Sequence, residues 1–193
     1  MGQKAQYRSA IRSRRMIREA YTQLLKEKPL SKITVTDIVT MADLNRATFY
    51  AHYPDVRGVT EEIENEIIEK MLEVLKEFKF TNFFSNPVPL LLKINRHIEA
   101  DIEFYRTLIL ANGSEIFMEK LKSVFTDYML NYSDIPENMR HSKMVSLRVC
   151  YFSGGIVNMY KQWLNGELDC SINDIALELG KLLQLEQKDL FGQ

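Results

Sequence analysis

The stretch that most constrains the fold is TVTDIVTMADLNRATFYAHYPD, residues 34–55. It carries two short helical patterns with a tight turn, MADLN, between them. Thr34 is suited to cap the first helix, and Asp37, three residues later, completes a capping-box pattern. Asn45 is the expected N-cap of the second helix, and Pro54 ends it, because a residue that precedes proline is disfavoured in the α conformation. Two short helices around a tight turn predict a helix-turn-helix.

Helical patterns continue on both sides of this stretch and predict an all-α fold with about nine helices. Leu, Ile, Met, Glu and Lys dominate the sequence, whereas only eight Gly and five Pro occur. The expected helices cover about residues 6–27, 34–42, 46–53, 55–78, 90–100, 102–110, 115–132, 139–164 and 172–187. We expect no strand, repeat or low-complexity tract.

The charge is unevenly distributed along the chain. Residues 1–57 hold eleven Lys and Arg against five Asp and Glu, a balance of +6, whereas the remainder has a balance of −7. A basic N-terminal part followed by an acidic remainder suggests that the N-terminal part binds a polyanion, although a solvated charged helix would give the same charge balance. The sequence predicts no signal peptide, no membrane span and a cytoplasmic location. Cys150 and Cys170 are expected to be buried thiols in a reducing compartment.

The second short helix is unusually polar for a core element. A helix that reads DNA needs hydroxyl, amide and guanidinium groups that can meet base edges and phosphates. Arg46, Ala47 and Thr48 lie in its first turn, the part of such a helix that enters the major groove. Arg46 can pair with guanine, and Thr48 can meet a thymine or a phosphate.

The aromatic residues of this helix divide into two groups. Phe49 and Tyr53 are four residues apart and are expected to pack back onto the first helix. Tyr50 and His52 diverge from that side and are free to face a partner. The alternative for Tyr50 and His52 is an aromatic lid over the core.

The segment ITVTDIVTMADLNRATFYAHYPDVRGV, residues 33–59, resembles the DNA-binding signature of the TetR family of bacterial transcription regulators. The shared features are a Thr-initiated helix, the turn, Thr-Phe-Tyr, and an aromatic pair before a capped long helix. The resemblance covers about residues 10–60. The segments FYRTLILANGSEIF and VCYFSGGIVNMYKQWLNG are similar to a C-terminal domain common in TetR relatives of low-GC Gram-positive bacteria.

This resemblance implies two domains and a function. Residues 1–54 would form the helix-turn-helix DNA-binding domain, and residues 55–193 a helical effector-binding and dimerisation domain. The family pattern makes Tyr50 and His52 contacts to the DNA backbone, and Thr36 a phosphate or base contact. A homodimer would bind a palindromic operator on double-stranded DNA as a repressor that a small molecule releases. The expected DNA-binding residues are Thr36, Asn45, Arg46, Ala47, Thr48, Tyr50, His52 and Arg57.

Two positions depart from the family pattern. The family usually has Gly in the turn where this chain has Asp43, and we expect Asp43 to adopt the left-handed conformation. The family usually has Lys, which holds a phosphate, where this chain has Val56. Arg57 can take over that contact with the help of the helix N-terminus.

The last two helices are candidates for a dimer interface. The helix around residues 146–164 is apolar on most of its circumference, and the last helix has a clean apolar stripe. Gly154 and Gly155 lower helix propensity, which is understandable if another backbone or a ligand approaches them. We expect half of an intermolecular four-helix bundle. The alternative is that a single chain uses both faces.

The C-terminal domain also has enough aromatic and Met surface for an apolar effector cavity. Plain core packing is the alternative for any one of these residues. No cofactor is expected. His97, Glu99 and Asp101 alternate and so do not share a helix face, and no metal site is expected. The candidate ligand-binding residues are Phe104, Tyr105, Tyr151, Asn158 and Met159.

A co-regulator controlled by a protein partner and an enzyme are the two alternative functions. Some TetR relatives with a similar C-terminal region are DNA-binding co-regulators controlled by a protein partner, for instance dihydroxyacetone-kinase subunits, and the sequence is compatible with that. An enzyme would need a nucleophile–base pair, a metal set or a glycine-rich phosphate loop, and we find none of these patterns. We therefore expect a regulator and not an enzyme.

Overall fold

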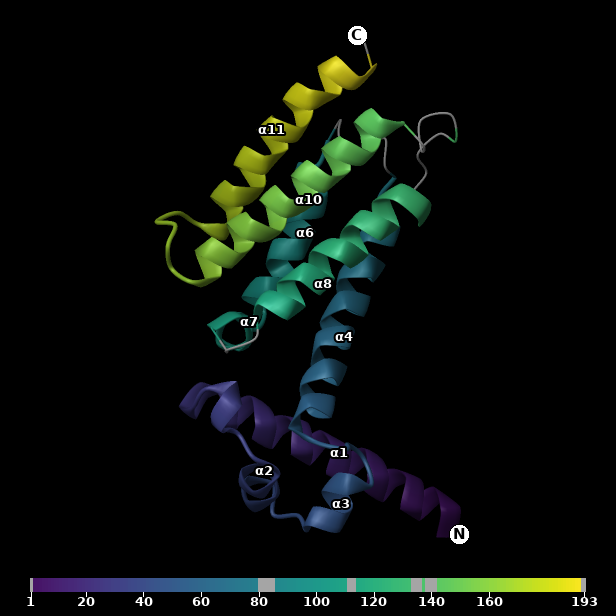
Figure 1. The fold of residues 1–193 in the computed structure, drawn as a ribbon, viewed down its shortest axis with the longest axis vertical. Helices are drawn as coiled ribbons and strands as arrows, with labels where there is room; N and C mark the ends of the chain where they lie inside the picture. The colour runs from purple at the N-terminus through teal and green to yellow at the C-terminus, as the bar shows by residue number, and fades with distance from the viewer. Residues whose placement is uncertain (1, 80–85, 111–113, 133–136, 138–141, 192–193) are drawn as a thin grey trace. The chain divides into compact units, whose positions relative to one another are not determined.

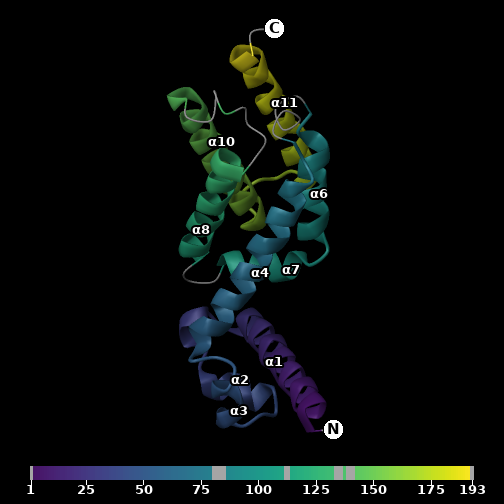
Figure 2. The ribbon, with the colours of Figure 1, turned by 90° about the vertical axis from the view of Figure 1, so that its right-hand side faces the viewer.

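The computed structural model describes residues 2–79, 86–110, 114–132, 137 and 142–191. Within these ranges the chain forms nine α-helices and no strand, so the predicted all-α fold is confirmed (Figures 1 and 2). The helices are α1 (Gly2–Glu27), α2 (Val35–Met41), α3 (Arg46–Tyr50), α4 (Val56–Lys76), α6 (Val88–Glu99), α7 (Ile102–Leu110), α8 (Ser114–Asp127), α10 (Lys143–Leu164) and α11 (Ile172–Phe191). A 3₁₀ turn covers Leu30–Lys32, and a π-helical turn, Tyr128–Tyr132, follows α8. None of the described helices is long and apolar enough to cross a membrane.

The chain divides into two compact units. The first comprises Met1–Glu66 with Leu110–Gly113, and the second comprises Ile67–Ile109 with Ser114–Gln193. The sequence suggests a boundary at Asp55, where α4 is capped, but the first compact unit extends through the first part of α4.

In the first unit, α1 packs against α2 and α3 (Figure 2). Ile17 and Tyr21 of α1 are fully buried, as are Ile38 of α2 and Phe49 of α3. Burial of these apolar side chains holds the two short helices in place, since helices of this length are not stable alone in water.

Local signals set the ends of α2. The Asp37 N–H donates to the Thr34 hydroxyl at 3.2 Å and the Thr34 N–H donates to the Asp37 carboxylate at 2.8 Å, which confirms the predicted capping box. Hydrogen bonds from Lys28 and Thr34 lower the pKa of Asp37 to about 2. At the other end Asp43 has a φ of 52°, as expected, and the Leu44 N–H donates to the Val39 carbonyl at 2.9 Å. This is a Schellman ending with Asp in the position where Gly is usual.

In the second unit, α11 packs on α6 and α10, and α10 also packs on α8 (Figure 1). The contact between α11 and the start of α6 is close, because a Cβ atom at Gly180 would collide with the Val88 side chain. Asn95 is fully buried where α6, α10 and α11 meet. Its amide nitrogen donates to the Ile172 carbonyl at 2.8 Å, and the Tyr160 hydroxyl donates to its Oδ1 at 2.6 Å. These bonds satisfy a buried amide that would otherwise destabilise the core.

The prediction of buried thiols is wrong. Cys150 and Cys170 are both exposed. Cys150 lies on the outer side of α10 next to Tyr151, and Cys170 lies in the turn before α11. Their backbone carbonyls accept hydrogen bonds, that of Cys170 from the Trp163 indole at 2.8 Å and that of Cys150 from the Ser153 hydroxyl at 3.0 Å.

Candidate nucleic-acid interface

The first turn of α3 is held by its cap. The Asn45 Oδ1 accepts hydrogen bonds from the Thr48 backbone N–H at 2.7 Å and from the Thr48 hydroxyl at 3.0 Å, which confirms Asn45 as the N-cap. The amide nitrogen of Asn45 keeps its donors for another partner. Ala47, on the same turn, is exposed.

Arg46 and Thr36, both candidate DNA contacts, lie side by side. The Arg46 guanidinium donates to the Thr36 hydroxyl at 2.6 Å, and both side chains are exposed. The first turns of α2 and α3 therefore present one continuous polar surface. The hydrogen bond also limits the conformations of a long and flexible side chain.

Tyr50 and His52 occupy different environments. The Tyr50 side chain is 54% exposed, and its ring meets Phe49 edge to face at 5.6 Å between centroids. His52 is half-buried, with Nε2 at 2.7 Å from the Ser13 hydroxyl of α1. The alternative role of an aromatic lid over the core therefore applies in part to His52. One of its ring nitrogens is already hydrogen-bonded to Ser13 of the same unit.

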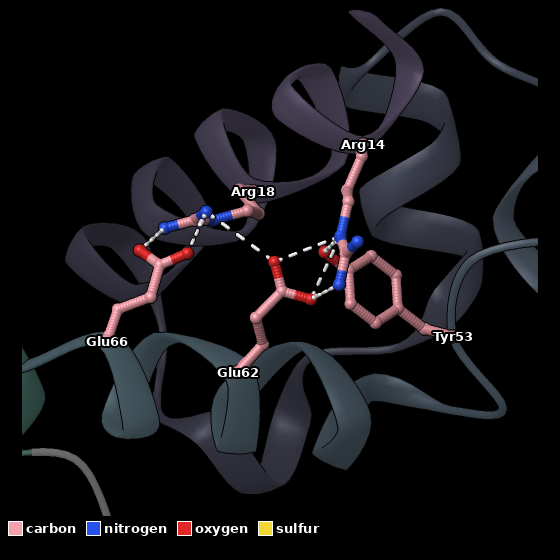
Figure 3. A network of polar contacts seen from close by, with 5 residues as sticks. All are labelled: Arg14, Arg18, Tyr53, Glu62 and Glu66. Carbon is pink, nitrogen blue, oxygen red and sulfur yellow. Dashed lines mark hydrogen bonds and ion pairs between the residues drawn. The ribbon is translucent and has the colours of Figure 1, made fainter. Parts of the chain in front are cut away.

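A polar network joins α1 to α4 (Figure 3). Arg14 forms an ion pair with Glu62, and its Nε also lies 3.3 Å from the Tyr53 hydroxyl. Arg18 pairs with Glu66 and approaches Glu62 at 3.5 Å. The sequence carries a pattern that predicts this network. Two Arg lie four residues apart on α1 and two Glu lie four residues apart on α4, so that each helix has two like charges on one face and the two faces have opposite charge.

This network positions the start of α4 more than it stabilises the fold. The hydrogen bond that Arg14 donates to Glu62 raises the pKa of Arg14, but the Arg14 side chain is about half exposed, so water screens the pair. A buried hydrogen bond of 2.7 Å between the hydroxyls of Tyr21 and Thr60 lies on the same helix–helix contact. Together they fix the direction in which α4 leaves Pro54.

Arg57 lies at the N-terminus of α4. Asp55 caps this helix, since its carboxylate accepts a hydrogen bond from the Gly58 N–H at 2.9 Å. Arg57 is exposed and its Nε donates to Glu61 at 2.8 Å, a pair of the weak surface type. Val56 is half-buried and offers no polar group at this end.

The second unit contains a partly open apolar cavity of about 110 Å³. Side chains of α4, α6, α7, α8 and α10 line it. Of the five candidate ligand-binding residues, only Tyr105 is on the wall. Phe104, Tyr151, Asn158 and Met159 do not line this cavity.

The periodicity of α10 explains which of its residues line the cavity. Ser153, Ile156 and Tyr160, three and four residues apart, face the cavity. Tyr151 and Asn158 are on the exposed side, and the Tyr151 side chain is 74% exposed. Because both sides of α10 are rich in apolar residues, the sequence alone did not separate them. Across the described ranges, no three His, Cys, Asp or Glu side chains are placed to hold a metal ion.

Comparison with known proteins identifies the chain. Residues 85–185, just over half of the sequence, match the TetR C-terminal family described as "Transcriptional regulator C-terminal region". The chain belongs to the TetR family of transcriptional regulators. No curated protein matches it significantly.

Solved structures of TetR regulators share the fold. A TetR transcriptional regulator from Streptococcus agalactiae 2603V is 21% identical, with a TM-score of 0.68 over 93% of this chain and 98% of that one. The dihydroxyacetone kinase operon activator DhaS is 17% identical, with a TM-score of 0.61 over 93% and 97% of the two chains. A regulator from Aquifex aeolicus VF5 is 18% identical, with a TM-score of 0.59 over 90% and 98%. At these identities the likeness shows the fold alone.

Proposed function

We propose that this TetR regulator is a cytoplasmic, ligand-responsive repressor that binds a palindromic operator as a homodimer. The observation that carries the proposal is the polar surface formed by the first turns of α2 and α3, where Arg46 and Thr36 are joined and exposed. Phe49 is buried beneath it, so that the surface is presented by a packed helix. A supported recognition helix with exposed hydrogen-bonding groups at its N-terminus is suited to the major groove.

Each candidate residue has a role in this proposal. Arg46 reads a guanine and Thr48 contacts a thymine or a phosphate. Asn45 donates through its amide nitrogen, and the Ala47 methyl group approaches a base. The remaining contacts go to the DNA backbone and fix the register of the helix. They come from Thr36, Tyr50, His52 and Arg57.

The homodimer would form through α10 and α11. Met144, Leu147 and Tyr151 are exposed at helical spacing on α10, and α11 exposes Leu182 and Leu185. Apart from the adjacent residues and the nearby backbone of α10 itself, a Cβ atom at Gly154 or Gly155 would meet no described atom within 4 Å. A second copy can therefore approach α10 closely at these glycines. A two-fold dimer has two α3 helices, which fits an operator with two inverted half-sites.

The cavity is the proposed effector site. Its apolar wall lies wholly in the second unit. A ligand that binds the operator-incompetent state better would shift the population away from DNA binding.

Operator recognition can be tested without knowing the regulated genes. Selection from a pool of random duplexes should yield an inverted repeat, and Arg46→Ala with Thr48→Ala should abolish its specific retardation. A bidentate Arg–guanine pair contributes about 1–3 kcal/mol of base discrimination, so the double variant should keep only salt-sensitive, non-specific binding. Arg96→Ala, an exposed Arg of α6, is the matched control and should bind as the parent does. Unchanged operator affinity in the double variant would exclude α3 as the reading helix.

The phosphate contact assigned to Arg57 has its own test. Arg57→Ala should weaken binding to all sequences alike and should reduce the slope of log K against log salt by about 1, since about one fewer counterion is released. Fluorescence anisotropy over a range of salt concentrations measures this slope. Lys70→Ala, an exposed cation later in α4, should leave the slope unchanged. An unchanged slope for Arg57→Ala would mean that Arg57 does not replace the Lys that the family usually has at position 56.

Control by a protein partner is the second candidate. The similar fold of the activator DhaS keeps it open. The apolar cavity in the second unit favours a small molecule instead. Purification with a stoichiometric partner and no response of operator binding to any cavity ligand would support the second candidate.

A further inference from the structure

The wall of the cavity restricts what can bind there. Sixteen of the nineteen described residues that line it are Ile, Leu, Val, Met or Phe. None of the nineteen is a charged residue or an amide. The other three are Tyr105, Ser153 and Tyr160.

Two of the three wall hydroxyls are already paired within the protein. The Ser153 hydroxyl donates to the Cys150 carbonyl at 3.0 Å and accepts from the Thr126 hydroxyl at 2.9 Å. The Tyr160 hydroxyl donates to Asn95. Only Tyr105 has a hydroxyl with no hydrogen bond to another described residue. Burial and the nearby Asp101 carboxylate raise the pKa of Tyr105, so this hydroxyl is neutral.

The shortage of free polar groups on the wall limits how polar a bound ligand can be. A charged group that enters the cavity loses its hydration and finds no opposite charge, and each further hydroxyl loses hydrogen bonds to water without replacement. One polar atom can be accommodated, at Tyr105. Apolar surface is favoured because its removal from water needs no specific partner.

The volume decides the size. Cavities of about 150 Å³ lined by Leu, Ile and Phe hold a molecule such as benzene, whereas drug-sized ligands occupy about 300–1,000 Å³. The volume of about 110 Å³ is therefore suited to a compact molecule. Met71 and Met118 on the wall give it some adaptability, since unbranched Met side chains repack readily.

We infer that the cavity binds a small, neutral, apolar molecule of about the size of benzene, with at most one hydrogen-bonding group. Charged ligands and polyols are excluded from it. The inference rests on the proposed function, in which occupancy of this cavity controls operator binding. It adds the chemical class of the effector.

A series of probes with one ring and different charges tests this class. Toluene, benzoate and benzylammonium are titrated into the full-length protein by calorimetry, and the midpoint of thermal unfolding is recorded with each. Toluene should bind and raise the midpoint, because a ligand of the native state stabilises it. The two ions should bind at least about 100-fold more weakly, since each would be buried without a partner. An ion that binds as tightly as toluene, or no binding of toluene, overturns the inference.

Variants locate the binding site. Val157→Phe puts a ring into the cavity and should reduce toluene affinity by more than 10-fold, whereas Ile116→Phe is the matched control because Ile116 is 70% exposed and off this wall. Far-UV circular dichroism shows whether each variant folds. If Val157→Phe does not fold, Val157→Thr keeps the size, adds a hydroxyl and should weaken toluene several-fold. Tyr105→Phe should leave toluene unchanged and weaken benzyl alcohol. Unchanged toluene affinity in the folded Val157 variant overturns the inference.

Retardation of the selected operator in the same samples separates this inference from the proposed function. If toluene binds but operator retardation does not change, the inferred class of ligand stands and regulation through this cavity is contradicted. Operator binding with no toluene binding contradicts the ligand class and leaves DNA recognition standing.

Discussion

Tyr151→Glu is expected to make the protein monomeric and to lower its operator affinity by about 10²- to 10⁴-fold, the range in which linked binding sites gain avidity. The Tyr151 side chain is 74% exposed in the middle of α10, on the same face as Leu147. In a dimer formed through this face, the new carboxylate would be buried without a partner. A monomer would keep its recognition helix but could hold only one half-site.

Sedimentation velocity and operator retardation measure the two effects. Ile116→Glu introduces the same charge at an equally exposed apolar residue of α8, and it should leave both the assembly state and the operator affinity unchanged. A Tyr151→Glu protein that stays dimeric with unchanged affinity would show that α10 is not the dimer interface. Monomers that still bind the full operator with the parent affinity would contradict the palindromic dimer itself.

Phe49→Ala is expected to lower the free energy of unfolding of the first unit by about 3–5 kcal/mol, as for other buried Phe side chains. Phe49 is fully buried, and its ring lies 5.9 Å from that of Tyr53. Because α3 has only five residues, it cannot persist without this packing. Specific DNA binding should therefore be lost together with stability.

Urea unfolding and amide hydrogen exchange in α2 and α3 test this expectation. Tyr50→Ala is the control, because it removes the neighbouring ring at a half-exposed position and should cost about 1 kcal/mol or less, as surface substitutions do. It should instead weaken DNA binding through the lost backbone contact. Equal destabilisation by both substitutions would refute the division of the aromatic residues into a packing pair and a DNA-facing pair.

The parts of the fold that were predictable from the sequence depend on interactions between near neighbours. Thr34 with Asp37, Asn45 with Thr48, and Asp55 with Gly58 each span three residues. Such pairs are visible in the sequence because the chemistry of capping needs particular residue types at fixed spacing. The polar surface of α3 was also predictable, because it is made by neighbouring residues of one short segment.

The rest depends on contacts between distant residues. Arg14 and Glu62 are 48 positions apart, and Asn95 and Tyr160 are 65 apart. The sequence shows each side chain but not its partner. The cavity was harder still, because a cavity is the space left where aliphatic side chains of five helices fail to fill the core. The candidate ligand-binding residues chosen from the sequence were mostly aromatic, such as Tyr151, whereas Ile and Leu form most of the cavity wall.

The network of Arg14, Arg18, Glu62 and Glu66 limits how this protein can be divided for engineering. A fragment cut after Pro54 would contain every residue expected to contact bases but would lose both glutamates and Thr60. Arg18 would lose both of its described ion-pair partners, and Arg14 would keep only its contact with Tyr53. The Tyr21 hydroxyl would lose its only described hydrogen bond. A fragment designed to keep the proposed DNA-binding surface should therefore contain α1 to α3 together with the part of α4 that ends at Glu66. Chimaeras that join this fragment to another sensor should place the junction beyond Glu66, inside the helix and not in the loop before it.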